Sequence, residues 1–353
     1  MKNISFITKN LKPLNALSSY NNYKSVRQQG KIPKISYIPP RFSFTITSKC
    51  NLRCPTCLYV LQGSGFFEKS DFMRFDDYKS ILHRYKKYIT NLTLTGGEAT
   101  LHPELEKFIA FSNSLGLKVS LISNGILVRK KLSALKGLHD LNITLDATDF
   151  ESFARNRGGT EKQWGHIMEG LQTLRENNIK FAISCLVTRK NVDELFQLID
   201  FADEFHPTTL RLNSFNPHNE SSDLVLSKSD PHVVQVMAEI MKRNDYPYNI
   251  KMPFVFDDRH PYFTNKICLY PWHGAYINEK CEVAYCCHLP HDARIGNICV
   301  HYDFNSKKML AWRRMLLNHQ LPVDCRFCHR RFKGDYSKFI AKKGIWKDND
   351  PFN

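Results

Sequence analysis

Residues 42–57 read FSFTITSKCNLRCPTC. Apolar and polar side chains alternate over the first six residues, which predicts a β-strand with one buried face. The loop after this strand carries Cys50, Cys54 and Cys57. Three thiolates at C-x3-C-x2-C spacing can converge on one metal centre and leave part of it open. Structural zinc sites and electron-transfer iron cubanes normally take four protein ligands, so an open position favours a chemical role.

Strand-like and helix-like segments alternate on both sides of this loop. Strands are predicted at 42–47, 91–95, 117–123, 141–145, 180–187 and 208–213. Helices are predicted near 76–89, 102–115, 127–138, 161–177, 191–205 and 230–243. This alternation is typical of βαβ units, whose right-handed crossovers give a parallel sheet.

The predicted strands have one apolar and one polar face. The apolar face carries Leu92, Leu94, Val119, Leu121, Leu141, Ile143, Leu145, Leu210 and Leu212. The polar face carries Thr93, Thr95, Ser120, Asn142, Thr144, Asp146, Ser184, Arg211 and Asn213. Six β/α units are too few for a closed eight-stranded barrel with an apolar filling. We therefore predict an α/β fold, a partial (β/α)6 TIM barrel that surrounds a polar ligand, because unpaired buried polar groups are costly. An antiparallel sheet with one wet face is the alternative.

The chain has 353 residues and a formal net charge of +16, and its basic residues concentrate at both ends. Residues 1–67 hold ten Lys or Arg and no acid, and residues 306–353 hold twelve against four acids. Such ends favour an acidic or phosphorylated substrate, although a solvated surface explains them equally well. An RNA-binding signature is missing, so a nucleic-acid partner is not expected. Neither an apolar run of about 18 residues nor a signal peptide is present, so we expect a cytoplasmic protein without a membrane partner.

The cysteines are concentrated in the last third of the chain. Seven of the eleven fall between residues 268 and 328. Without an export signal, cysteines are expected to be metal or redox ligands rather than disulfides. The predicted segments are a basic N-terminal extension at 1–40, the partial barrel at 41–245, a cysteine-rich module at 246–335 and a basic C-terminal tail at 336–353.

A Gly-Gly-Glu sequence follows the second predicted strand. Gly96 and Gly97 allow a backbone to approach a ligand closely, and Glu98 adds a carboxylate acceptor. Alone, this sequence could equally be a plain turn before a helix. Together with the cysteine loop it resembles the radical S-adenosylmethionine (SAM) superfamily. The resemblance implies a [4Fe–4S] cluster on the three cysteines, SAM on the remaining iron, and a Gly-Gly-Glu turn that holds the methionine amino group.

Further SAM contacts are implied by the same resemblance. Many members have an aromatic residue before the third cysteine; this chain has Thr56 there, and Tyr59 is the candidate for an aromatic contact. The residues that correspond to SAM-binding positions on the third and fourth strands are Ser123, Asn124, Thr144, Asp146 and Arg157. Ser123 and Asn124 would reach the ribose hydroxyls, although Ser-Asn-Gly is also ordinary turn chemistry. Arg157 would pair with the cofactor carboxylate, or else be a surface arginine on a loop.

The last third of the chain resembles the auxiliary-cluster module called SPASM, in its shorter twitch form. The resemblance implies one auxiliary [4Fe–4S] cluster on four ligands, which are Cys268, Cys286, Cys325 and Cys328. Cys287 competes with Cys286 as the second ligand. The alternative is a zinc site on four cysteines, which are Cys286, Cys287, Cys325 and Cys328. The remaining thiols, Cys185, Cys281, Cys287 and Cys299, are expected to be packing residues, or in one case a hydrogen donor near the interior.

The resemblance implies a radical SAM oxidoreductase that removes hydrogen from a peptide or an aminosugar-like substrate. Net oxidation fits an auxiliary cluster that accepts an electron, and a flavodoxin or ferredoxin would supply the activating electron. Redox-neutral epimerisation with a cysteine thiol as hydrogen donor is the alternative. A non-enzymatic iron–sulfur or zinc scaffold that binds a polyanion is the third hypothesis. Arg211 and Asn213 at the last strand are the expected substrate contacts.

Overall fold

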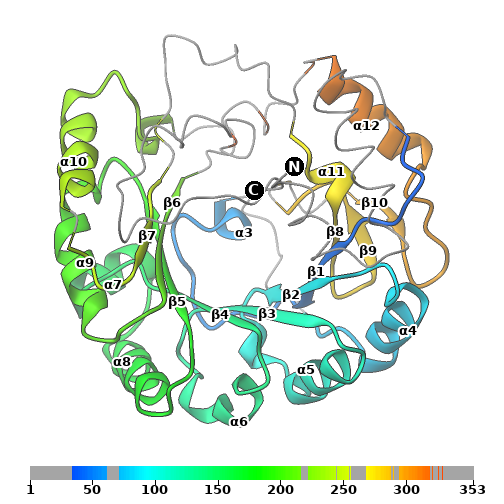
Figure 1. The fold of residues 1–353 in the computed structure, drawn as a ribbon, viewed down its shortest axis with the longest axis horizontal. Helices are drawn as coiled ribbons and strands as arrows, with labels where there is room; N and C mark the ends of the chain where they lie inside the picture. Colours follow the sequence, from blue (N-terminus) through cyan, green and yellow to red (C-terminus); the bar gives the residue numbers. More distant parts are fainter. Residues whose placement is uncertain are drawn as a thin grey trace.

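The computed structural model describes residues 34–61, 71–215, 222–243, 245–253, 255, 268–287, 289, 294–318, 320, 325 and 328. One sheet of ten strands runs through it in the order β10-β9-β8-β1-β2-β3-β4-β5-β6-β7 (Figure 1). The strands are β1 Arg41–Thr47, β2 Asn91–Gly96, β3 Lys118–Ser123, β4 Asp140–Thr144, β5 Ala182–Val187, β6 Thr209–Ser214, β7 Asn249–Lys251, β8 Gly274–Ile277, β9 Glu282–Ala284 and β10 Arg294–Asn297. The α-helices are α3 Leu58–Leu61, α4 Phe75–Tyr85, α5 Leu105–Ser114, α6 Leu132–Leu135, α7 Phe150–Arg157, α8 Glu161–Glu176, α9 Leu195–Asp203, α10 Pro231–Lys242, α11 Tyr270–His273 and α12 Lys307–Leu317.

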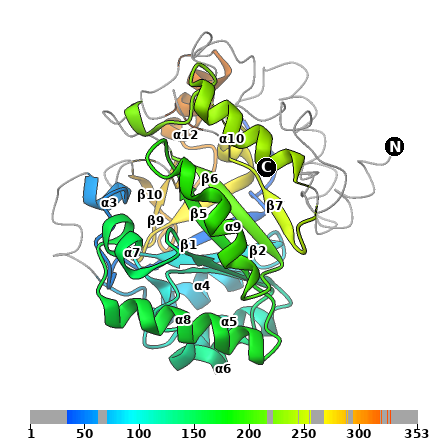
Figure 2. The same ribbon diagram turned by 90° about the vertical axis from the view of Figure 1, so that its left-hand side faces the viewer.

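Every strand pair from β8 through β1 to β7 is parallel, which confirms the predicted α/β class. The sheet is curved and its two edges do not meet; helices α4, α5, α6, α8 and α9 lie on its outer side, and the short helix α3 lies inside the curve (Figure 1). Helix α9, for example, crosses outside β5 and β6 (Figure 2). The alternative of an antiparallel sheet is therefore wrong for the barrel, and the antiparallel pairs β8–β9 and β9–β10 lie only at one edge.

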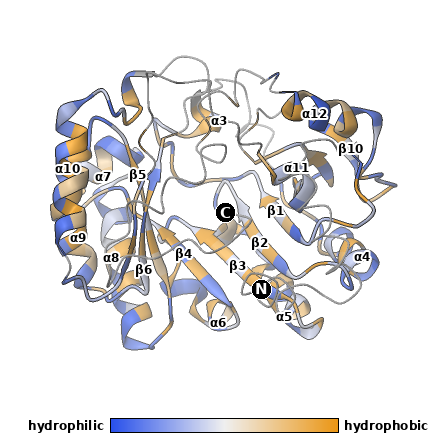
Figure 3. Ribbon diagram, turned by 45° about the horizontal axis from the view of Figure 1, so that its top comes forward, coloured by the Kyte–Doolittle hydropathy of each residue, from blue (hydrophilic) through white to orange (hydrophobic). Residues whose placement is uncertain are grey.

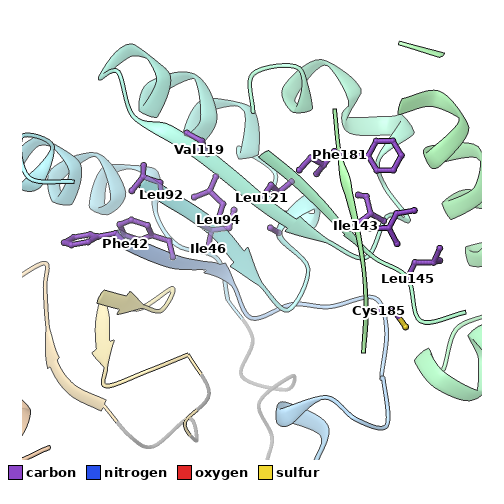
Figure 4. Packing of buried hydrophobic residues seen from close by; sticks show 14 of the residues in the cluster. Phe42, Ile46, Leu92, Leu94, Val119, Leu121, Ile143, Leu145, Phe181 and Cys185 are labelled. Carbon is purple, nitrogen blue, oxygen red and sulfur yellow. The ribbon is translucent and has the colours of Figure 1, made fainter. Parts of the chain in front are cut away.

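The apolar faces of the strands form the main hydrophobic core together with the helices. All nine residues predicted for the apolar face are at most 1% exposed, and Figure 4 shows several of them pointing from β2, β3 and β4 toward the helices. In Figure 3 the strands β2, β3 and β4 carry hydrophobic, orange stretches. Burial of a Leu or Ile side chain stabilises the fold by about 1.5–3 kcal/mol. This apolar layer therefore determines that the other, polar face of each strand points toward the interior of the barrel.

The inner face of the sheet is predominantly polar, as predicted. Ser184 and Asn142 are buried there, and the Asn142 amide donates a hydrogen bond to Ser184 Oγ at 2.9 Å. Ile122 is an exception that the strand pattern did not predict. It pairs in register with Asn142 and is 41% exposed, so the inner face has an apolar spot beside its polar groups.

The cysteine-rich part of the chain joins the same sheet rather than forming a sheet of its own. Strand β8 pairs in parallel with β1, with Phe44 opposite Ile277. Ile277 and Val283 belong to the same hydrophobic cluster as the barrel strands. The sequence did not predict this continuity, because the pairing joins segments more than 200 residues apart.

The described end of the N-terminal extension is part of the fold. Ile35 and Tyr37 are buried. The backbone N–H of Ile35 donates to Asn305 Oδ1 at 2.8 Å, and the Tyr37 hydroxyl donates to the carbonyl of Trp272 at 3.0 Å. The extension therefore contacts the C-terminal part of the chain. The remainder of the extension and the basic C-terminal tail lie outside the described residues.

One prediction for the cysteine-rich module needs correction. The expectation of no disulfide is wrong for Cys281 and Cys299, which are bonded with their Cα atoms 5.8 Å apart, a separation ordinary for a disulfide. Cys281 occupies the β8–β9 turn in the left-handed region of the backbone, with φ 63°. No helix in the described part of the chain has the length and hydrophobicity needed to cross a membrane.

Candidate active site

The cysteine loop, residues 48–57, connects β1 to the short helix α3. Cys50, Cys54 and Cys57 are half-buried, and the N–H of Cys57 donates to the carbonyl of Cys54 at 3.0 Å in a tight turn. The start of the loop is fixed by Ser48, whose N–H donates to the carbonyl of Asp71 at 3.1 Å. The three thiols therefore stand on a short, hydrogen-bonded loop at the carboxyl end of a central strand.

The environment of the thiols is that of a partly dehydrated ligand group. Burial raises the pKa of Cys50 to about 11, although the N–H of Leu52 opposes the shift. Burial also raises the pKa of Cys54, while the nearby Arg157 charge lowers it. The neighbouring Cys54 and Cys57 thiols add to the upward shift of the Cys50 pKa. Three soft donors that stand on one short loop and are not disulfide-bonded fit a [4Fe–4S] cluster, which binds thiolates.

Gly96 and Gly97 bring the turn after β2 against the cysteine loop. A Cβ on Gly96 would lie 2.2 Å from the carbonyl oxygen of Thr47, and one on Gly97 would lie 2.4 Å from that of Lys49. The N–H of Gly97 donates to Thr47 O and that of Glu98 to Lys49 O, both at 2.8 Å. The close approach that the glycines allow is therefore an approach to the cysteine loop itself.

The Glu98 carboxylate binds groups of this chain on both of its oxygens. Its Oε1 accepts from the Thr100 N–H at 2.9 Å, from the Thr100 hydroxyl at 2.5 Å and from the Ser123 hydroxyl at 2.9 Å. Its Oε2 accepts from the Asn124 N–H at 2.6 Å, and the residue is 2% exposed. A carboxylate has about four acceptor positions. Glu98 thus ties β2 to β3, and binding of a methionine amino group by its side chain stays a prediction.

Ser123 and Asn124 are engaged in the same network. Besides its bond to Glu98, Ser123 Oγ accepts from the Gly125 N–H at 3.1 Å. The Asn124 amide donates to Asn51 Oδ1 of the cysteine loop at 2.7 Å. These two side chains therefore connect the end of β3 to the turn after β2 and to the cysteine loop. Their predicted contact with a ribose is not tested by these bonds.

Asp146 and Arg157 form a buried ion pair beside the cysteine loop. Arg157 Nη1 donates to Asp146 Oδ2 at 2.6 Å, and the side chains are 11% and 7% exposed. Asp146 Oδ1 accepts from the Leu186 N–H at 2.7 Å. Burial alone would lower the pKa of Arg157, but Asp146 and the nearby thiol of Cys54 raise it above its usual range. The guanidinium stays charged, and its Nε has no partner among the described residues.

Arg157 is the last residue of α7, a helix that the sequence analysis did not predict. Asp149 caps the helix through the Ser152 N–H at 2.8 Å. Gly158 ends it with φ 65°, and a Cβ there would lie 3.0 Å from the Arg53 carbonyl oxygen. The reading of Arg157 as a surface arginine on a loop is therefore wrong, because a helix end carries it into the protein.

The remaining predicted contacts lie on the inner face of the sheet. Thr144 is half-buried at the end of β4. Arg211 on β6 has its Nη2 atom 3.3 Å from Asp140 Oδ2, so part of its charge is compensated within the chain. Asn213 is exposed. Arg211 and Asn213 therefore face the same side as Thr144, as expected, but nothing in these contacts identifies a substrate.

Tyr59 takes part in a contact that the sequence did not indicate. The Tyr59 hydroxyl lies 3.1 Å from the hydroxyl of Tyr276 on β8. The Tyr276 hydroxyl in turn lies 2.6 Å from Thr45 Oγ1 on β1. Burial raises the pKa of both tyrosines, so both stay protonated. Cys57 and Cys287 are among the charges that act on Tyr59 and Tyr276 respectively. The tyrosine pair thus lies between the cysteine loop and the C-terminal cysteines.

Several of the C-terminal cysteines are close together. A hydrogen bond with the Cys287 thiol is the largest cause that raises the pKa of Cys286 well above its usual value, and burial is the second. Cys268 and Cys328 add to the shift. Cys328 is buried and Cys325 is half-buried. Of the remaining thiols, Cys185 is buried in the main hydrophobic cluster, as expected of a packing residue. The arrangement suits a cluster ligand set but leaves the choice between Cys286 and Cys287 open.

A separate group joins the disulfide to the helix α4. Within the described residues, Asp77, Cys281 and Cys299 are the group of metal-ligand type whose donor atoms all lie within 4.8 Å. Two of these three residues are already bonded to each other. The group therefore fits a structural disulfide with a neighbouring carboxylate rather than a second metal centre.

An open parallel barrel with three thiols on the loop after its first strand defines a class of proteins that bind an iron–sulfur cluster with an incomplete protein ligand set. The family model of the Radical SAM superfamily matches residues 44–202, which contain the loop and the Gly-Gly-Glu turn. Residues 44–202, a little less than half of the chain, therefore form a radical SAM domain, which implies SAM and a [4Fe–4S] cluster as cofactors.

Curated relatives share sequence over about half of the chain. GTP 3′,8-cyclase of Limosilactobacillus fermentum is 30% identical over 186 residues, which are 50% of this chain and 54% of the relative. GTP 3′,8-cyclase of Helicobacter pylori is 23% identical over 201 residues, which are 55% of this chain and 61% of the relative. The matched segments therefore span less than two thirds of these relatives.

Solved structures share the fold over a larger part of the chain. Streptococcus suis SuiB aligns with a TM-score of 0.61 at 13% identity and covers 90% of this chain and 77% of its own. The structure of anSMEcpe with bound AdoMet aligns with a TM-score of 0.59 at 18% identity and covers 84% of this chain and 85% of its own. At these identities the likeness concerns the fold alone.

Proposed function

We propose that this radical SAM enzyme performs a net oxidation of a peptide or an aminosugar-like substrate with the help of one auxiliary [4Fe–4S] cluster. When bound at Cys50, Cys54 and Cys57, the first cluster supplies reductive cleavage of SAM to methionine and a 5′-deoxyadenosyl radical, which removes a hydrogen atom from the substrate. The loop that carries these three thiols is the observation that supports the proposal most directly.

The chain's own residues would hold the cofactor in place. The Gly96–Gly97 backbone lies against the loop, and the Arg157 guanidinium lies near Cys54 with one donor not satisfied by the described residues. A guanidinium can donate to a carboxylate through such positions. Arg157 is therefore the proposed partner of the SAM carboxylate, with Asp146 holding its side chain in orientation.

The auxiliary cluster is proposed at Cys268, Cys286 or Cys287, Cys325 and Cys328. Its support is the proximity of Cys286 to Cys268, Cys287 and Cys328, which all act on the Cys286 thiol. Four protein ligands would close this cluster to substrate, so its role would be to accept an electron from the substrate radical. A flavodoxin- or ferredoxin-type protein is the proposed external reductant. Zinc at the same cysteines would remove the electron acceptor and with it the oxidation.

A cyclisation of GTP is the second candidate function. It is favoured by the names of the sequence relatives, which are GTP 3′,8-cyclases. Because those matches cover only about half of this chain, they support shared radical chemistry more strongly than a shared substrate. Incubation of the reduced, reconstituted enzyme with SAM and GTP tests this candidate, since GTP would be consumed together with SAM and not in the absence of SAM.

The central experiment is anaerobic reconstitution followed by reduction and SAM addition. We expect about eight irons per chain for two cubanes, and formation of 5′-deoxyadenosine. Cys54→Ala should abolish 5′-deoxyadenosine while Gln172→Ala, a change at an exposed position of α8, should not. Continued formation in Cys54→Ala would rule out the cofactor assignment, and iron without SAM cleavage in the wild type would favour the scaffold hypothesis.

Product mass separates the possible outcomes once a substrate is found. Net oxidation removes two hydrogen atoms from the substrate for each SAM consumed. Epimerisation leaves the mass unchanged in water and adds one deuterium when the reaction is run in D2O, because a thiol would return a solvent-derived hydrogen. A product two mass units lighter therefore supports the proposed oxidation, and deuterium uptake at constant composition supports the epimerase alternative.

A further inference from the structure

One peptide unit of the cysteine loop connects helix α8 to the sulfur of Cys50. The amide of Gln163 donates from Nε2 to the carbonyl oxygen of Asn51 at 2.9 Å. The N–H of the same peptide unit, on Leu52, lies 3.4 Å from Cys50 Sγ and donates to it. A group on α8 therefore acts on a proposed iron ligand through a single planar unit.

We propose that Gln163 is a positioning residue for the cluster: it fixes the Asn51–Leu52 peptide unit and thereby maintains the N–H···S bond to Cys50. The proposal rests on the proposed function, since it assumes a cluster on the cysteine loop. It concerns a residue that neither the motifs nor the strand pattern singled out.

The orientation of the Gln163 amide is determined by its own helix. Gln163 is the third residue of α8, and its Oε1 accepts from the Thr160 N–H at 2.8 Å in a capping box. The acceptor end is thus turned toward the cap, and the NH2 end is left to donate to Asn51. A glutamate would complete the same capping box but would have no donor for the Asn51 carbonyl.

The Asn51–Leu52 unit is held from a second side as well. Asn124 donates from Nδ2 to Asn51 Oδ1 at 2.7 Å, so the side chain of Asn51 is fixed by β3 and its carbonyl by α8. The junction between α7 and α8 lies close to the loop at this point. A Cβ on Gly159 would be 2.1 Å from the ring of Phe153 and 3.1 Å from Leu52 Cδ2. These contacts hold the loop in place but involve side chains of Asn51 and Leu52, so the restraint on rotation of the peptide unit itself comes from the Gln163 bond to the Asn51 carbonyl.

The consequence for a bound cluster follows from its charge. Hydrogen bonds to the sulfurs of an iron–sulfur cluster, together with its net charge and exposure, set its reduction potential. An N–H that points at Cys50 Sγ favours the more negative, reduced state. Loss of the Gln163 bond should let the peptide unit rotate, weaken the N–H···S bond and make the cluster harder to reduce.

The test is a redox titration of the reconstituted cluster without substrate, in which electron paramagnetic resonance monitors the reduced form. Gln163→Glu and the uncharged Gln163→Leu should both titrate at more negative potential than the wild type. Gln172→Glu is the matched control, since it makes the same charge change on an exposed part of α8. Thr160→Ala is the structural control, because it weakens the cap but keeps the Gln163 amide, and its potential should equal that of the wild type.

The outcomes separate this inference from the proposed function. A wild-type chain that assembles no cluster overturns the proposed function. A wild-type cluster whose potential is unchanged in both Gln163 variants overturns the positioning role alone. A shift in Gln163→Glu that Gln172→Glu reproduces also overturns it, because charge would then be the cause. If a folded Gln163 variant holds less iron than Thr160→Ala, the bond to Asn51 is needed for the cluster even to form, which supports the role.

Discussion

Glu98 Oε2 accepts the backbone N–H of Asn124 at 2.6 Å, which joins the turn after β2 to the end of β3. Because the same carboxylate also binds Thr100 and Ser123, it acts as the centre of a buried polar network. The Gly-Gly-Glu sequence in this position therefore has a structural role that does not depend on a bound cofactor. The acid aligns the ends of two adjacent strands beneath the cysteine loop.

Glu98→Gln is expected to reduce the free energy of unfolding by about 1–3 kcal/mol, because an NH2 group would replace an acceptor that faces only donors. The measurement is urea denaturation of the protein without cofactor. Glu106→Gln, at an exposed position of α5, is the control and should unfold like the wild type. Equal stability of Glu98→Gln and Glu106→Gln would show that the network does not need a carboxylate.

Two glycine substitutions should have effects of opposite sign. Gly97→Ala places a Cβ 2.4 Å from the Lys49 carbonyl and should destabilise the fold by about 1–3 kcal/mol, as overpacking does. Gly165→Ala on α8 meets no atom of the described residues within 4 Å and should stabilise by about 0.5–1 kcal/mol, because alanine is the better helix former. Thermal unfolding measures both. A lower unfolding temperature for Gly165→Ala than for the wild type would contradict the finding that a Cβ at this position meets no neighbouring atom.

The ion pair between Asp146 and Arg157 should be costly to break from one side. Arg157→Met removes the cationic partner of the buried Asp146 carboxylate and leaves it with the neutral Leu186 N–H and Cys185 thiol, so a loss of about 3–5 kcal/mol is expected. The double variant Arg157→Met/Asp146→Asn removes the unpaired charge and should recover part of that stability. Urea denaturation of the single and double variants decides the question, and additive losses would contradict a coupled pair.

The tyrosine pair provides a test of the connection between the barrel and the C-terminal region. Tyr276→Phe removes a hydroxyl that contacts both Tyr59 and Thr45, and a loss of about 1–3 kcal/mol is expected for two hydrogen bonds. Tyr285→Phe is the control, since that ring stacks on Trp312 and keeps its packing as phenylalanine. If Tyr276→Phe is as stable as Tyr285→Phe, the pair does not join the two regions energetically.

The strands of the barrel could be predicted from the sequence because their alternation records burial directly. Leu94 and Leu121 were expected on the outer face and are buried against the helices. Helix α7 was missed because its sequence FESFARNR has few apolar residues and its capping box uses Asp149 with Ser152 rather than a glutamate or glutamine. Its position depends on contacts with the cysteine loop that lies 100 residues earlier in the chain.

The composition of the site was predictable, but its internal partners were not. The spacing of Cys50, Cys54 and Cys57 singles them out as candidate ligands of one metal centre. The sequence does not show that Asn124 donates to Asn51 or that Asp146 pairs with Arg157, because those contacts depend on which strand ends become neighbours. Gln163 carries one recoverable signal, since Thr160 and Gln163 form a capping-box pattern that predicts the start of α8. Its donor bond to the loop is a property of the folded chain.

His102, which follows the Gly-Gly-Glu turn, should make the stability of the fold dependent on pH. The residue is buried, its Nδ1 accepts from the Glu104 N–H at 3.1 Å, and its Nε2 therefore carries the hydrogen that faces the Met73 carbonyl at 3.0 Å. Burial lowers the pKa of His102 below its ordinary value of 6.5, although the bond to Met73 opposes the shift. The neutral imidazole is the form that the folded protein holds.

The direction of the pH effect follows from proton linkage. Because the unfolded chain binds the His102 proton more tightly than the folded chain, acid favours unfolding. The full stability is present above the unfolded pKa of 6.5 and falls as the pH decreases toward the lower folded pKa. Thermal unfolding from about pH 7.5 to pH 5 should show this decline in the wild type and in the exposed-site control His139→Gln, but less of it in His102→Gln. Identical pH profiles for His102→Gln and His139→Gln would mean that other groups cause the decline, and that the turn after β2 tolerates a charged imidazole.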